Sequence, residues 1–301
     1  MKVFVQIPCY NEADSIAQTI ADIPKEIAGV SEVSVVVIDD GSTDNTAEIA
    51  LKNGADHVVH HHMNLGLATA FKSGLDYCLE QGADIILNTD GDGQYRGKYI
   101  PALLAPLLED KAEVVIGNRQ VHEKESYTSF HRRFHRLGSR FINCLLGVDV
   151  DDPISGFRAI RANVARRLNI HSSFSYTTEM LVQLRYLKIH IMNIPVTTNS
   201  TTRPSRLYKK PMGFVVLTGL TVLRAYAMYF PLRALLPIAG LCFLIGTIPI
   251  VRFLIAYGAG EGMGHIQSLI LAAMAIILGT IITLFAMLFD FQLRQKWRNG
   301  A

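Results

Sequence analysis

The sequence predicts an α/β domain with a mostly parallel sheet, followed by a juxtamembrane helix and two transmembrane helices. In the first half of the chain, short apolar or β-branched runs alternate with stretches of helical spacing. In the last third, two uncharged segments are long enough to cross a bilayer. Half of the 301 residues are hydrophobic and 18% are charged, which excludes a disordered chain.

The alternation in the first half indicates βαβ units, whose ligands bind at the carboxyl ends of the parallel strands. The expected strands are Val3–Ile7, Val33–Ile38, His57–His60, Ile85–Leu87 and Val114–Ile116. The expected helices between them are Ala13–Ile23, Thr43–Leu51, Leu67–Glu80 and Tyr99–Leu108.

The middle of the chain is less regular. Residues 120–147 are basic and rich in histidine, and they resemble an inserted loop followed by a helix. Val164–Leu168 and Thr177–Leu187 have helical spacing, and Ile191–Val196 is typical of a strand.

Two segments near the C-terminus predict membrane crossings. Ala234–Val251 is uncharged for 18 residues and would span about 27 Å as a helix. Ile266–Phe289 is uncharged for 24 residues, or about 36 Å. The loop between them has no lysine or arginine, whereas basic residues lie outside both segments. The positive-inside rule therefore places both ends of the hairpin in the cytoplasm.

Charge and cysteine content narrow the partners and the compartment. A net charge of +3, from 29 basic and 26 acidic residues, does not indicate a nucleic-acid-binding protein. Six basic residues and no acidic one lie between Arg203 and Arg233, where they would attract anionic lipid head groups. Four scattered cysteines imply no disulfide framework. A strand-like N-terminus predicts that the first two hundred residues stay in the cytoplasm.

Acidic groups follow the ends of three expected strands. Asp90-Gly91-Asp92 comes directly after the fourth strand, and two such carboxylates can hold a divalent cation that bridges a diphosphate. Glu12 follows the first strand, and Asp39 and Asp40 end the second. All three groups are expected at the edge of the sheet where ligands bind.

These motifs resemble a known family. PCYNE, IDDGSTDNT, NLGLATA, DGDGQY and IGNR are similar to the family 2 glycosyltransferases of GT-A fold. DPISGFR at 152–158, FSYTTE at 174–179 and RPSR at 203–206 resemble the branch of dolichyl-phosphate mannose synthases and polyprenyl-phosphate glycosyltransferases. The C-terminal segments are similar to those of members with two transmembrane helices.

The resemblance implies roles for individual residues. Asp90 and Asp92 would hold Mg²⁺ or Mn²⁺, and Asp92, Arg119 and Asp152 would be catalytic, with Asp152 as an orienting group beside the acceptor. The implied nucleotide-sugar site contains Pro8, Tyr10, Glu12, Ile38, Asp40, Asp90, Gly91 and Gln94. Arg119 and Arg203 would bind the acceptor phosphate, with Arg206 or Lys209 as the second charge. Arg132 and Arg136 in the basic insertion are further candidates, because two anions must be brought together.

The implied reaction is the inverting transfer of one hexose from a nucleotide sugar to a polyprenyl phosphate. The donor would be of the UDP-glucose type or GDP-mannose, and the acceptor undecaprenyl or dolichyl phosphate. A processive polysaccharide synthase is a rival, although its QxxRW signature is missing, and a catalytically inactive membrane scaffold is another. Homo-oligomerisation stays open.

The expected organisation has five parts, with the protein in the plasma membrane as a multi-pass protein and its catalytic domain in the cytoplasm. They are a catalytic domain (1–210), an amphipathic juxtamembrane helix (211–233), transmembrane helices (234–257 and 265–290) and a cytoplasmic tail (291–301).

Overall fold

The computed structural model describes residues 1–120, 129–172, 175–199, 211–259 and 266–298. The chain divides into two compact units, Met1–Val222 and Leu223–Ala301.

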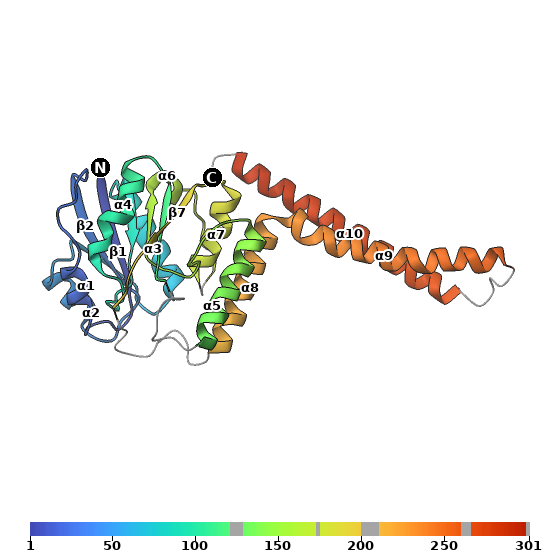
Figure 1. The fold of residues 1–301 in the computed structure, drawn as a ribbon, viewed down its shortest axis with the longest axis horizontal. Helices are drawn as coiled ribbons and strands as arrows, with labels where there is room; N and C mark the ends of the chain where they lie inside the picture. Colours follow the sequence, from blue (N-terminus) through green and yellow to red (C-terminus); the bar gives the residue numbers. More distant parts are fainter. Residues whose placement is uncertain (121–128, 173–174, 200–210, 260–265, 299–301) are drawn as a thin grey trace. The chain divides into compact units, whose positions relative to one another are not determined.

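The first unit contains a seven-stranded sheet with helices on both faces (Figure 1). The strands are β1 (Lys2–Cys9), β2 (Glu32–Asp39), β3 (His57–His60), β4 (Ile85–Asn88), β5 (Val114–Asn118), β6 (Arg158–Arg161) and β7 (Ile191–Pro195). They lie in the order β3-β2-β1-β4-β6-β5-β7, and β6 is antiparallel to its neighbours β4 and β5, whereas the other pairs are parallel. The predicted α/β class with a mostly parallel sheet is confirmed.

Helices cover the sheet because alternate strand residues are apolar on both faces. The helices of this unit are α1 (Ile16–Ala21), α2 (Thr46–Lys52), α3 (Leu67–Glu80), α4 (Ile100–Leu108), α5 (Ser129–Leu146), α6 (Ala162–Ala165) and α7 (Tyr176–Tyr186). Helices α1, α2 and α4 share one core cluster with Val3, Val5 and Ile7 of β1. On the other face, an ideal Cβ on Gly74 of α3 would lie 2.8 Å from Ile38 Cδ1.

The order of the strands indicates where a ligand site lies in this sheet. From β1 the chain runs outward to β2 and β3, and it then returns to place β4 on the other side of β1. Such a reversal of strand order opens a crevice at the carboxyl ends of β1 and β4. Cys9 ends β1 and Asn88 ends β4, so the loops that follow them meet there.

Several element boundaries differ from the expected ones. Helix α1 begins at Ile16 rather than Ala13, because residues 12–15 form a turn in which Ser15 N donates to Glu12 O (3.0 Å). Helix α2 begins at Thr46 rather than Thr43, after a turn in which Thr46 N donates to Asp44 Oδ1 (3.1 Å). The sequence did not predict β6, whose four residues show no clear alternation of apolar and polar side chains.

Two long helices form a hairpin in the second unit (Figure 1). Helices α9 (Pro231–Gly258) and α10 (Ile266–Arg298) are long and apolar enough to cross a membrane. Of the most apolar stretch of 18 residues in each helix, only 11% is buried in α9 and 17% in α10. The core helices of a soluble protein are, by contrast, mostly buried. Helix α8 (Pro211–Tyr229) ends before the expected residue 233, because the chain breaks at Phe230 and Pro231 starts α9.

Glycines allow the two hairpin helices to approach closely. A Cβ on Gly246 of α9 would lie 2.7 Å from Ile276 Cγ1 and 3.0 Å from the Ala272 carbonyl oxygen of α10. Gly240, also on α9, has no atom within 4 Å of its ideal Cβ.

We therefore expect Gly246→Val to destabilise the hairpin by about 2 kcal/mol through overpacking. Gly240→Val is the matched control, because it makes the same chemical change on the same helix at an open position. Unfolding of the full chain in mixed micelles, followed by circular dichroism, should give a lower midpoint for Gly246→Val alone. Equal midpoints for the two variants would contradict close packing at Gly246.

Candidate active site

The Asp90-Gly91-Asp92 turn is held against the ends of β1 and α1. Thr89 N donates to Gln6 O (3.1 Å), and the Gly91 carbonyl accepts hydrogen bonds from Ser15 Oγ (2.8 Å) and Thr19 Oγ1 (3.3 Å). An ideal Cβ on Gly91 would lie 2.5 Å from Cys9 Sγ, so only glycine fits there. The turn presents Asp90 partly buried and Asp92 exposed.

A glycine from the distant 152–158 segment packs against Asp90. An ideal Cβ on Gly156 would lie 2.7 Å from Asp90 Oδ1 and 3.1 Å from the Tyr176 hydroxyl. Hydrogen bonds hold this glycine from both sides. Its N–H donates to the Tyr95 hydroxyl (3.1 Å), and its carbonyl accepts from Asn88 Nδ2 (2.8 Å) and the Tyr176 hydroxyl (3.4 Å). The backbone therefore approaches the carboxylate more closely than any other residue would permit.

Beneath this contact lies a buried network of polar and aromatic side chains. Gln6 Nε2 donates to Asn88 Oδ1 (2.9 Å) in the centre of the sheet. Tyr176 stacks on Phe71 with ring centroids 3.7 Å apart, and Tyr95 stacks on Phe157 at 4.9 Å. These contacts leave the two tyrosine hydroxyls little freedom, so they can position Gly156 accurately.

Electrostatics distinguish Asp90 from an ordinary surface carboxylate. Burial, and then the negative charge of Asp92, raise the pKa of Asp90 to about 7. Two carboxylates that repel each other at the end of a buried strand would gain from a cation between them.

The donor set fits a hard divalent cation. Asp90 and Asp92 supply carboxylate oxygens, the ligands that Mg²⁺ and Mn²⁺ prefer. Among the described residues, no group of three or more histidine, cysteine, aspartate or glutamate side chains could hold a metal ion. Asp90 and Asp92 would provide two ligands, and phosphate oxygens and water would fill the other positions, as in many magnesium sites.

Arg119 and Asp152 form a buried ion pair near this turn. Arg119 Nε donates to Asp152 Oδ2 (2.6 Å) and Nη2 to Oδ1 (2.9 Å), a bidentate arrangement. The Asp152 side chain is 1% exposed, whereas that of Arg119 is 16% exposed. The neighbouring Asp151 is exposed and accepts a hydrogen bond from Asn118 Nδ2 (3.0 Å). The structure therefore brings two of the expected catalytic residues, Arg119 and Asp152, together.

Arg158 is a second buried cation on this side of the sheet. Its guanidinium donates to the carbonyl oxygens of Ser155 (2.8 Å), Thr177 (2.9 Å) and Pro153 (2.7 Å). These bonds fasten the 153–155 turn to the start of α7, and burial lowers the pKa of Arg158. In the sequence, Arg158 appears only as part of the DPISGFR motif. Its burial could not be predicted, because its three acceptors are main-chain carbonyl oxygens, which every residue type has.

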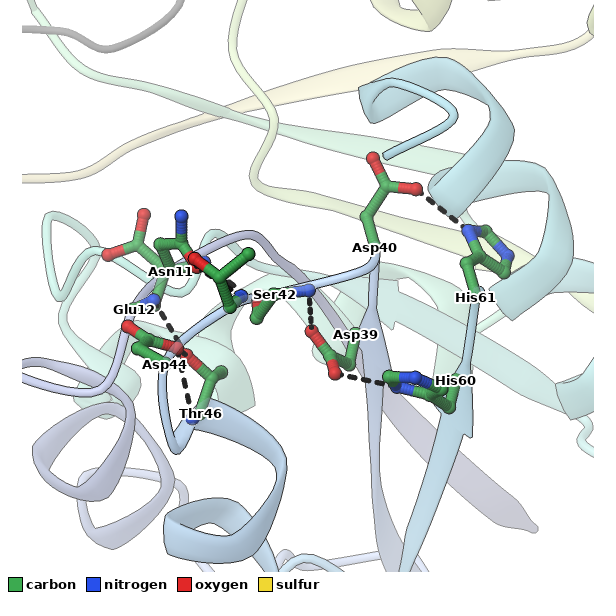
Figure 2. Close-up of polar contacts among 10 residues, drawn as sticks. Asn11, Glu12, Asp39, Asp40, Ser42, Asp44, Thr46, His60 and His61 are labelled. Atoms are coloured by element: carbon green, nitrogen blue, oxygen red, sulfur yellow. Dashed lines mark hydrogen bonds and ion pairs between the residues drawn. The ribbon is translucent and has the colours of Figure 1, made fainter. Parts of the chain in front are cut away.

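The loops after β1 and β2 are tied together at the expected nucleotide side (Figure 2). Asn11 N donates to Ser42 Oγ (2.9 Å), Thr43 N to Asn11 Oδ1 (2.8 Å) and Glu12 N to Thr46 Oγ1 (2.8 Å). Asn11 has a φ of 56°, a left-handed conformation that asparagine tolerates better than most residues. Tyr10 is 38% exposed at the edge of this surface.

Asp39, the last residue of β2, and Asp40, which follows it, contact different groups. Asp40 accepts hydrogen bonds from Leu65 N (2.9 Å) and Gly66 N (2.8 Å) and pairs with His61 Nδ1 (2.8 Å). Asp39 accepts from Ser42 N (3.0 Å) and pairs with the half-exposed His60 (2.8 Å; Figure 2). Both Asp40 oxygens thus already brace the loop before α3, and the sequence did not predict either histidine partner.

Other expected site residues lie in different surroundings. Pro8 and Ile38 are buried, and Ile38 packs under α3, so its side chain faces the core. Gln94 N donates to Asp92 Oδ1 (3.0 Å), which shapes the turn after the carboxylates. Arg136 is exposed on α5. Arg203, Arg206 and Lys209 lie outside the described residues, as does the side chain of Arg132.

Comparisons with known proteins identify the family and similar chains. Residues 4–168 match the family model described as Glycosyl transferase family 2. The chain is 28% identical over 207 residues to the undecaprenyl-phosphate mannosyltransferase of Micrococcus luteus, with 65% of this chain and 83% of that protein covered. It is 27% identical over 241 residues to a UDP-N-acetylglucosamine–dolichyl-phosphate N-acetylglucosaminyltransferase of Methanococcus voltae, covering 73% and 92%.

A solved structure confirms the GT-A-like fold. Glucosyl-3-phosphoglycerate synthase from Mycobacterium tuberculosis, crystallised with Mn²⁺, UDP and glucosyl-3-phosphoglycerate, matches with a TM-score of 0.57 at 20% identity. The match covers 76% of this chain and 79% of that one.

The raised pKa of Asp90 predicts pH-dependent metal binding. Only the ionised carboxylate is a ligand, so a proton competes with the cation as the pH falls through about 7. We expect Mn²⁺ affinity, measured by electron paramagnetic resonance, to weaken steadily below pH 7 and to level off above it.

Asp90→Asn should abolish this binding and its pH dependence. Asp76→Asn is the matched control, because Asp76 is an exposed residue of α3 that pairs with Lys72. Mn²⁺ affinity that stays constant from acidic to alkaline pH would contradict a role for Asp90 as a ligand.

Proposed function

The chain belongs to glycosyl transferase family 2 and is a glycosyltransferase, and we propose that it transfers one sugar from a nucleotide sugar to a polyprenyl phosphate. The observation that carries the proposal is the combination of a two-carboxylate turn at a strand end with two membrane-length helices in one chain. The two relatives named above act on undecaprenyl phosphate and dolichyl phosphate, which supports a lipid acceptor.

The donor would bind at the carboxyl ends of β1, β2 and β4. Asp90 and Asp92 would hold Mg²⁺ or Mn²⁺ against the diphosphate, and the cation would neutralise the charge that develops on the leaving group. Pro8, Tyr10 and Glu12 from β1 and its loop, with Ile38 and Asp40 from β2, would surround the nucleoside. Because Asp40 already braces residues 65–66, it would support that pocket, and Ile38 would contribute main-chain atoms.

The relatives differ in the sugar that their names specify. Relatives of nearly equal identity transfer mannose and N-acetylglucosamine, so overall similarity does not select one donor. A hexose from a UDP-glucose type donor or from GDP-mannose is the narrower proposal.

We infer that the transfer inverts the anomeric carbon and needs no strong protein base. An acceptor phosphate is already anionic at neutral pH and can attack directly. Asp152 is almost fully buried and its two oxygens bind Arg119, so the pair supports an orienting role. Asp152 would hold the Arg119 guanidinium toward the phosphates, where a fixed positive charge stabilises the transition state.

The acceptor would approach from the bilayer. Arg119, Arg132 and Arg136, with Arg203 and either Arg206 or Lys209, would offset the repulsion between the donor diphosphate and the acceptor phosphate. Helices α9 and α10 would anchor the enzyme in the plasma membrane with both ends in the cytoplasm, as the distribution of basic residues favours.

Activity should require a divalent cation and Asp92. Full-length enzyme in proteoliposomes with undecaprenyl phosphate should convert one member of a panel of UDP-glucose, UDP-N-acetylglucosamine and GDP-mannose to a lipid product detected by mass. We expect EDTA to abolish turnover and Asp92→Asn to lower it by about 10³-fold, since a metal ion contributes several kcal/mol. Full turnover in EDTA would rule out the metal, and no lipid product with any donor would rule out the proposed acceptor.

Loss of the buried ion pair should disturb the acceptor side. Asp152→Asn removes one negative charge and leaves the Arg119 guanidinium without its bidentate partner, so kcat/KM for polyprenyl phosphate should fall about 100-fold. Asp151→Asn is the matched control, because it makes the same change one residue earlier on an exposed side chain.

A double-mutant cycle separates orientation from proton transfer. If Asp152 acts through Arg119, combining Asp152→Asn with Arg119→Lys should cost little more than either change alone. Fully additive losses, with the acid limb of the pH–rate profile removed only by Asp152→Asn, would identify Asp152 as a base instead.

A further inference from the structure

Asp40 is almost enclosed at the end of β2, where the nucleoside is expected. Its side chain is 4% exposed. Its main-chain N–H donates to the Cys9 carbonyl (2.9 Å), which fixes the residue against the end of β1. An ionised carboxylate accepts about four hydrogen bonds, two on each oxygen. The number of positions that the protein already fills therefore decides what a ligand can still donate to Asp40.

Donors from the protein occupy most of the Asp40 carboxylate. Oδ1 accepts hydrogen bonds from Leu65 N (2.9 Å) and His61 Nδ1 (2.8 Å), and Oδ2 accepts one from Gly66 N (2.8 Å). The imidazole is the donor in its pair, because an ionised carboxylate can only accept. Counted over the described residues, Oδ1 is saturated and Oδ2 keeps one acceptor position.

A chain of hydrogen bonds keeps His61 directed at this carboxylate. The ring is 10% exposed, and its other nitrogen, Nε2, lies 3.0 Å from Ser73 Oγ of α3. Helix α3 packs closely on the sheet at the next residue, where an ideal Cβ on Gly74 would lie 2.5 Å from Gln6 Oε1. The main-chain N–H of His61 donates to Asp39 O (2.9 Å). The imidazole is thus held at its main chain and at both ring nitrogens.

Apolar side chains are exposed on the loop that Asp40 holds. Met63 is 66% exposed and Leu65 is 45% exposed. The loop lies against the end of β2, because an ideal Cβ on Gly41 would lie 2.7 Å from Asn64 N. Apolar side chains beside a single polar acceptor suit an aromatic base, whose faces are apolar and whose edges carry the hydrogen-bonding groups.

We propose that Asp40 selects a uracil base and that His61 is the residue responsible for the selection. Uracil presents one N–H, at N3, which matches the single acceptor position on Oδ2. Guanine presents N1–H and its 2-amino group side by side, and this pair needs both oxygens of a carboxylate. Because His61 already donates to Oδ1, one guanine donor would lose its partner, which lowers affinity. The donor substrate is then a UDP-sugar rather than a GDP-sugar.

This inference rests on the proposed function, because it needs a nucleotide sugar at the carboxyl ends of β1 and β2. It narrows the donor from two classes to one. His61 is a positioning residue in this account, since it acts through an oxygen of Asp40, and Ser73 holds its ring.

Nucleoside diphosphates that differ by one group test the selection on the unaltered protein. Full-length protein in nanodiscs with Mn²⁺ is titrated calorimetrically with UDP, GDP and IDP, whose base is guanine without the 2-amino group. We expect UDP to bind at least about tenfold more tightly than GDP. IDP should bind about fivefold more tightly than GDP, because it presents a single N–H at this edge. GDP binding as tightly as either UDP or IDP would overturn the proposal.

Variants at position 61 test the role of the histidine. His61→Leu removes the donor to Oδ1 and frees a second acceptor position, so the ratio of the GDP and UDP dissociation constants should fall about fivefold. His61→Asn places an amide N–H near the position of Nδ1 and should keep the wild-type ratio. His190→Leu, at an exposed position just before β7, is the control.

A ratio that stays at the wild-type value in His61→Leu would overturn the role of His61. The comparison of GDP with IDP decides the base selection even if this variant does not fold. Preferential binding of GDP would overturn the uracil assignment and leave the proposed transfer intact. Absence of binding by all three nucleotides would overturn the nucleotide-sugar site, and with it both proposals.

Discussion

The close approach of Gly156 to Asp90 is the contact on which the candidate site depends. Any side chain at 156 would collide with the carboxylate or with the Tyr176 hydroxyl. The contact exists because β6 runs antiparallel to β4, with Arg158 opposite Asn88, so the residues before β6 reach those after β4. The Asn88 and Tyr176 side chains then hold the Gly156 carbonyl, and Tyr95 holds its N–H. An irregular strand in an otherwise parallel sheet thereby sets the position of a proposed metal ligand.

Charge is distributed unevenly across this contact. The outer side holds Asp90, which is partly buried, and Asp92, which is exposed, and the repulsion between their carboxylates favours a cation between them. The interior holds Arg158, which is bonded to main-chain carbonyls, and Asp152, which holds the partly exposed Arg119. Breaking such a buried pair costs far more than a surface pair contributes, so Arg119 has a fixed direction. A guanidinium oriented in advance can stabilise developing phosphate charge without reorganising, as the proposed transfer between two anions would require.

Strand–helix alternation was sufficient to predict the sheet, because apolar runs of four to eight residues are a local signal. It also predicted that Glu12, Asp40 and Asp90 gather at one edge of the sheet. It did not predict β6, the Gly156 contact or the histidine partners of Asp39 and Asp40, because these depend on residues far apart in the chain. The contacts of an individual aspartate could not be predicted from its motif either. Asp40 accepts hydrogen bonds from the main chain of residues 65 and 66, whereas Asp152 pairs with Arg119.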